Sequence, residues 1–103
     1  MALKPIFYLV IDAEVMSSSE GDIIIPVVSV FPRLSDNAVN KVLDRTIGLS
    51  ISEIIELILN GNEKLKGSYI FYKTPRGGYI FKRVKEGVEV PKELMEKYVT
   101  LPC

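Results

Sequence analysis

The stretch Ile6-Phe7-Tyr8-Leu9-Val10-Ile11 decides the predicted fold, because its first three residues recur as Ile70-Phe71-Tyr72. Each triplet begins a strand-like apolar run that leads through a loop and a second apolar run into an amphipathic helical segment. An internal repeat indicates architecture more directly than local propensity, since each copy is one supersecondary unit. The pattern therefore predicts a chain in which one small unit occurs twice.

The two copies align once a single difference in loop length is allowed. The first strands correspond at an offset of 64 residues, from Ile6 to Ile70, whereas Ile24 corresponds to Ile80 at an offset of 56. A hairpin loop eight residues shorter in the second copy reconciles the two offsets. Chance also produces a shared triplet in an isoleucine-rich chain, and amphipathic helices share their spacing in general, so an unduplicated chain stays an alternative.

These segments predict an α+β fold in which two ββα units, related by a pseudo-twofold axis, are joined by a central helix. The expected first unit covers residues 6–47, the connector helix 49–60 and the second unit 69–99, all in one compact domain over 1–103. Pro26 cannot donate a ladder hydrogen bond, so the strand over 23–31 is expected at a sheet edge or at a bulge.

Turn and cap residues predict where these elements begin and end. Ser35 and Ser50 are expected to cap two helices, the second through a capping box with Glu53. The glycines in the loop 74–78 indicate a second hairpin, in which Phe71 pairs with Phe81 across five loop residues or the loop is shorter. A last helix is expected from Val90 onward, with its apolar side chains facing inward.

Composition narrows the class of protein. The 103 residues contain no His, Trp or Gln, and one cysteine, Cys103, which excludes an intramolecular disulfide and favours a reducing compartment. Cys103 is either a free thiol or a dimer-linking one. Abundant Ile, Val, Lys and Glu fit a hyperthermophilic source, although chance also explains missing residue types in a short chain.

Neither a signal-peptide pattern nor an apolar run of about 18 residues is present. The expected location is therefore intracellular, in a host cytoplasm, without membrane insertion.

Charge divides the chain, although the total is zero. Residues 1–60 carry four basic and eight acidic side chains, whereas residues 61–103 carry nine basic and five acidic ones. The segment 64–85 interleaves basic and aromatic residues without an acid, which is typical of nucleic-acid binding. Its basic residues are Lys64, Lys66, Lys73, Arg76, Lys82, Arg83 and Lys85. The neutral total speaks against that class, so nucleic-acid binding is the alternative function.

The first hypothesis is a non-enzymatic protein–protein interaction module. Two like units leave a crevice at their junction, where an extended peptide could dock. Tyr8, Tyr72 and Tyr79 are the candidates for lining it, because tyrosine combines apolar area with a polar tip.

Metal binding and catalysis find little support. The carboxylates of Asp12, Glu14, Glu20 and Asp22 could together hold magnesium or calcium, but their spacing does not match a calcium loop, and no metal is predicted. Without His or a Gly-rich phosphate loop, no enzyme activity and no cofactor are expected.

Two resemblances remain. Residues 87–97, Gly-Val-Glu-Val-Pro-Lys-Glu-Leu-Met-Glu-Lys, resemble the helix entry of swapped-hairpin DNA-binding antitoxin domains. The whole chain, small, Ile-rich and without a widespread motif, resembles small proteins of filamentous viruses that infect hyperthermophilic archaea, of the Acidianus filamentous virus type. That resemblance implies a non-enzymatic protein with viral or host protein partners. We expect a monomer or a weak homodimer.

Overall fold

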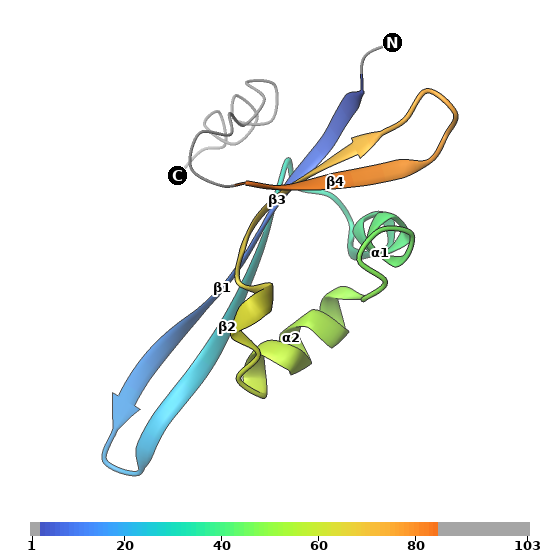
Figure 1. Ribbon diagram of the computed structural model, residues 1–103. Coiled ribbons are helices and arrows are strands. Elements are labelled where there is room, and N and C mark those ends of the chain that lie inside the picture. The colour runs from blue at the N-terminus through green and yellow to red at the C-terminus, as the bar shows by residue number, and fades with distance from the viewer. Residues whose placement is uncertain (1–2, 85–103) are drawn as a thin grey trace.

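The computed structural model describes residues 3–84, which form one antiparallel sheet with two short α-helices on one face (Figure 1). In chain order the elements are β1 (Lys4–Ser18), β2 (Gly21–Phe31), α1 (Asp36–Asp44), α2 (Ile51–Leu59), the 3-10 helix η1 (Glu63–Leu65), β3 (Gly67–Lys73) and β4 (Tyr79–Val84). The strand order is β2-β1-β3-β4, and each neighbouring pair is antiparallel. Strand β2 is thus an edge strand, which confirms the prediction drawn from Pro26.

The predicted pair of ββα units joined by a central helix is wrong. Both hairpins belong to one continuous four-stranded sheet, and both α-helices follow β2 in the chain and share one core with that sheet. Helix α2 therefore does not separate two units: its Ile54 and Ile58 are buried against the sheet. The reason is that β1 pairs on both of its edges, so β3 satisfies its free backbone groups directly. The helix expected from Val90 lies outside the described residues.

The repeated triplets meet at the centre of this sheet. Phe7 lies opposite Phe71, and their rings stack with centroids 4.6 Å apart at an interplanar angle of 22°. Pairing is interrupted only at Ile6, since Pro5 faces Tyr72 while Phe7 already faces Phe71. A bulge beside a proline is expected, because Pro5 has no N–H to donate to the ladder. The similarity of the two segments thus gives matching partners in one antiparallel pair.

The core lies between the sheet and the helices. Alternation along β1 sends its odd-numbered side chains, among them Phe7, Leu9 and Ile11, to the helices. The side chains buried to 2 % exposure or less in this core are Phe7, Leu9, Ile11, Val39, Leu43, Ile54, Ile58 and Phe71. Each contributes about 1.5–3 kcal/mol through removal of apolar surface from water. Within residues 3–84 no helix packs on the other face of the sheet, which we call the open face.

The helix caps agree with the prediction. The Ser35 hydroxyl accepts a hydrogen bond from the Ala38 N–H at 3.2 Å, and Ser50 forms the expected capping box with Glu53. The side-chain oxygen of Asn40 accepts from the Ile51 N–H at 2.9 Å, which ties the middle of α1 to the start of α2. The two helices are thereby held as one layer over the sheet.

Both hairpins are closed by turns with glycine at positive φ. Strands β1 and β2 stay paired as far as Ser18 and Gly21, so only two residues form their turn, and Gly21 has φ of 123°. Strands β3 and β4 are joined by five residues, and Phe71 pairs with Phe81, which decides the register that the sequence left open.

Candidate functional site

The outer half of the β1–β2 hairpin extends past the helices (Figure 1). We call residues 12–27 the arm. Four large apolar side chains are exposed on it: Val15 (61 %), Met16 (55 %), Ile23 (54 %) and Ile24 (37 %). Met16 pairs with Ile23, and the next pair, Val15 with Ile24, points to the opposite face because side chains alternate along a strand. The arm therefore presents apolar groups on both faces near its tip.

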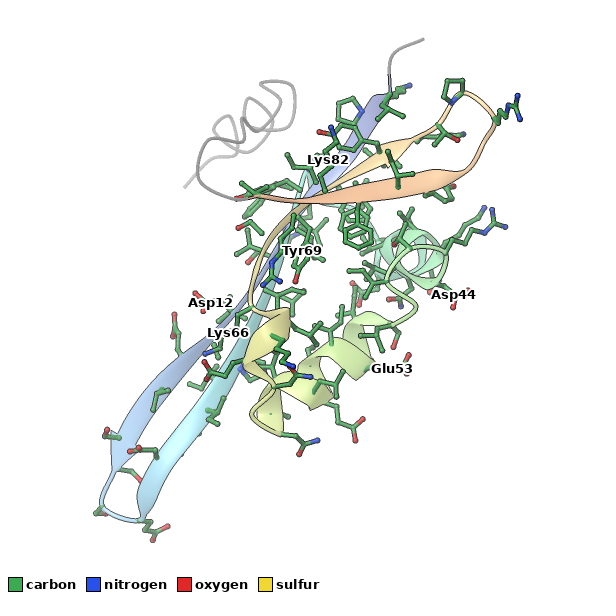
Figure 2. The ribbon with its side chains drawn as sticks, in the orientation of Figure 1. Asp12, Asp44, Glu53, Lys66, Tyr69 and Lys82 are labelled. Carbon is green, nitrogen blue, oxygen red and sulfur yellow. The ribbon has the colours of Figure 1, made fainter. Side chains whose placement is uncertain are left out.

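The arm is also the acidic part of the molecule. It carries Asp12, Glu14, Glu20 and Asp22, and no lysine or arginine occurs between residues 5 and 32. On the open face, Asp12 lies opposite Val27 and Glu14 opposite Ile25, so one strand supplies carboxylates and its partner supplies apolar side chains. Figure 2 shows Asp12 at the base of the arm.

The four carboxylates that could have held a cation are spread along the arm. Asp12 and Glu14 lie on the open face, Asp22 pairs with Ser17 on the other face, and Glu20 lies in the turn. Within residues 3–84 no group of three or more His, Cys, Asp or Glu side chains could hold a metal ion.

A basic pocket of about 460 Å³ lies at the other end of the sheet, between the start of β1, the end of β3 and helix α1. Among residues 3–84, five of the lining residues are apolar, and the others are three lysines and one tyrosine, with no acidic residue. The lining residues are Lys4, Pro5, Ile6, Leu34, Ala38, Lys41, Val42, Lys73 and Tyr79. We call this hollow the lysine pocket.

The lysine pocket is built by the sheet register and by α1. Lys4 pairs with Lys73, and Lys73 pairs with Tyr79, so three neighbouring strands bring these side chains together. Lys41 comes from the helix, and the Arg45 guanidinium lies 5.9 Å from the centre of the Tyr79 ring. Because the pocket combines several positive charges with apolar lining residues, it is suited to a group that is both anionic and apolar.

The three tyrosines predicted to line one groove lie on two faces of the sheet. Tyr8 is on the open face, where its ring lies 6.2 Å from that of Phe31. Tyr72 is on the same face, and the Lys82 ammonium lies 5.8 Å from its ring centre. Tyr79 instead packs against the core on the side of the helices and lines the lysine pocket. The groove expected between two repeated units is absent from residues 3–84, because those units do not form.

The basic residues of the second hairpin also separate. The Arg83 guanidinium donates hydrogen bonds to the carbonyl oxygens of Lys64, at 3.0 Å, and of Lys66, and lies 5.5 Å from the ring centre of Tyr69. Its role is to hold β4 against the segment that enters β3. The Lys66 ammonium pairs with Glu63 at 3.2 Å.

The remaining basic residues of this set point in several directions. Lys73 contributes to the lysine pocket, Arg76 lies in the β3–β4 loop, and Lys82 lies on the open face. Figure 2 shows Lys82 and Tyr69 on opposite sides of the β3–β4 hairpin. Lys85 lies outside the described residues.

Sequence reasoning missed the residues of the arm tip and two lysines of the pocket. Met16 directly precedes the polar stretch Ser17-Ser18-Ser19-Glu20, which hides that Met16 and Ile23 pair within an extended hairpin. Lys4 and Lys41 carried no local signal, since only the register of β1 and the position of α1 bring them to Lys73.

Comparison with known protein families, with curated proteins and with solved structures found no match. The resemblance to small proteins of archaeal filamentous viruses stays a prediction. Neither α1 nor α2 has the length and apolar content needed to cross a lipid bilayer, and residues 3–84 contain no other helix that does. The predicted host-cytoplasmic location is not tested by these findings.

Proposed function

We propose that this protein is a non-enzymatic interaction module that binds a protein partner through its arm. The observation that carries the proposal is the exposure of Val15, Met16, Ile23 and Ile24 at the arm tip. Side chains exposed to this extent add little to the stability of the fold, whereas their burial by a partner is favoured by about 25 cal/mol per Å² of apolar surface.

The charges of the arm specify the partner further. Its four carboxylates are spread along the same hairpin as the exposed apolar side chains, and the whole stretch from residue 5 to residue 32 lacks a basic group. A complementary surface has an apolar centre with lysine or arginine at its rim, because opposite charges speed encounter and fix orientation. The edge strand β2 adds backbone donors and acceptors that a partner strand can pair with, except at Pro26.

Nucleic-acid binding by the second hairpin has weaker support. Arg83 is engaged with backbone carbonyls of its own chain, and Lys73 and Lys82 face opposite sides of the sheet. A duplex or a single strand is bound most effectively by cations that share one surface. Among residues 3–84, basic side chains share one surface at the lysine pocket, whose lining also contains several apolar side chains.

The test places a photo-reactive amino acid at Met16 and, as a control, at Glu56, which is exposed on α2 away from the arm. Irradiation in native or virus-infected lysate is expected to link position 16, but not position 56, to one protein. This crosslink is expected to form equally in lysate that has been treated with nuclease. The linked protein is then purified, and its Kd is measured with the wild type and with Met16→Ser combined with Ile23→Thr.

A Kd that is unchanged by the double substitution contradicts the proposal. Linkage that disappears with nuclease contradicts it as well and favours the nucleic-acid alternative.

A further inference from the structure

We propose that the partner of the arm is a second copy of this chain, whose lysine pocket receives the arm tip. This inference rests on the proposed function and names the partner of that same surface. It follows from two surfaces of one molecule that are complementary in charge and in apolar character.

The arm and the lysine pocket carry opposite charges. The arm has four carboxylates and no basic group, whereas the lining of the lysine pocket, as far as residues 3–84 form it, has three ammonium groups and no acidic residue. Arg45, close to Tyr79, adds a further cation beside the pocket. Within residues 3–84, the ion pair between Lys66 and Glu63 lies outside both surfaces, so neither the arm carboxylates nor the pocket lysines take part in it. Contact between two copies brings the opposite charges together.

The arm tip and the lysine pocket both also present apolar side chains. Met16 and Ile23 form an exposed cross-strand pair next to the turn, and the apolar residues that line the pocket include Pro5, Ile6 and Val42. A pocket of about 460 Å³ has room for the side chains of such a pair. Their burial supplies the affinity, and the surrounding charges fix the orientation.

One molecule cannot make this contact with itself. The pocket begins at Lys4 and the arm turns after Ser18, which are the two ends of the single strand β1. At about 3.3 Å per residue, these ends are about 46 Å apart, and the hydrogen-bonded hairpin keeps them apart. Two copies arranged antiparallel along this strand make the contact twice, which closes a dimer of the commonest symmetry.

The test uses two variants that each lose one half of the contact. Met16→Ser with Ile23→Thr removes the apolar tip of the arm, and Lys41→Gln with Lys73→Gln removes two charges of the pocket. Arg76→Gln with Lys82→Gln is the matched control, because it removes the same charge from exposed residues that do not line the pocket. Sedimentation equilibrium measures the dissociation constant of each protein at low salt.

The wild type and the control are expected to dimerise with equal affinity, more weakly at high salt. Each of the two test variants alone is expected to dimerise at least about tenfold more weakly, because one loses the apolar contact of the arm tip and the other loses two charge pairs of the pocket. An equimolar mixture of the two variants is expected to recover mixed dimers, because the intact arm of one variant fits the intact pocket of the other.

A monomeric wild type, or a mixture that does not recover association, overturns the inference. Association that depends on the arm but not on Lys41 and Lys73 also overturns it, while it leaves the arm as an interaction surface for another partner. If the arm variant associates as the wild type does, this inference is overturned, and the photo-crosslinking at Met16 decides the proposed function separately.

Discussion

The first strand of each hairpin contains the same Ile-Phe-Tyr triplet, but the two hairpins differ in length, in charge and in how far they extend from the core. The β3–β4 hairpin is short, basic and held to the core by Phe71, whereas the β1–β2 hairpin continues past the helices and ends in the acidic arm. The difference shows that the triplet determines the central pairing only. The residues after it decide whether a hairpin stays on the core or extends beyond it.

The largest expected effect tests the part that both hairpins share. Phe71 is fully buried and stacks on Phe7 at 4.6 Å and on Phe81 at 5.6 Å between ring centroids. Phe71→Ala is expected to lower the free energy of unfolding by about 3–5 kcal/mol, because it leaves a cavity between two strands. Urea unfolding measures the loss. Phe81→Ala, at a side chain that is 40 % exposed, is the control and is expected to cost clearly less.

The next effect concerns the anchor of the basic hairpin. Arg83→Met keeps the apolar stem over Tyr69 and removes the hydrogen bonds to the carbonyls of Lys64 and Lys66. The expected loss is about 1 kcal/mol, because charged donors contribute more than neutral ones but this site is exposed. Chemical unfolding of Arg83→Met and of Arg76→Met, which changes the same residue type in the loop, gives the comparison. Equal stabilities would show that Arg83 does not anchor β4.

A smaller and more local effect is expected at the turn of the acidic hairpin. Gly21 has a backbone φ of 123°, which an alanine residue rarely adopts. The added Cβ itself would find no atom within 4 Å. Gly21→Ala is expected to cost about 1 kcal/mol of local stability, through backbone strain alone. Amide hydrogen exchange should accelerate near Met16 and Ile23 but not at Phe71. Faster exchange throughout the sheet would mean that the arm and the core unfold together.

The smallest effect on stability is expected at the arm tip itself. Met16→Ser with Ile23→Thr should change the free energy of unfolding by no more than about 0.5 kcal/mol, because both side chains are more than half exposed. Thermal unfolding at a protein concentration that keeps the chain monomeric measures it. A loss comparable to that of Phe71→Ala would show that the tip supports the fold and is not a free interaction surface.

Much of the local structure could be predicted from the sequence. Ser35, and the capping box of Ser50 with Glu53, act where their spacing placed them, and Pro26 lies on an edge strand. These features depend on hydrogen bonds between residues a few positions apart, so a short window of sequence contains the physical cause.

The candidate site could be predicted only in part. The acidic character of residues 12–22 and the basic character of the second half are visible in the sequence. The exposure of Met16 and Ile23 was missed, because a strand pair that outgrows its covering helices cannot be recognised without the positions of those helices. Tyr8 and Tyr79 were expected together and lie on opposite faces, since strand pairing, and not residue type, assigns each face.

The sequence by itself determined the strands, the helix starts and the division of charge, because each depends on neighbouring residues. Only the tertiary structure decided that Phe7 pairs with Phe71, that two hairpins form one sheet, and that Lys4, Lys41 and Lys73 meet. The physical reason is that an antiparallel strand can pair on either edge with any matching partner. The choice depends on the common core that the pairing buries, and that core joins residues more than sixty positions apart.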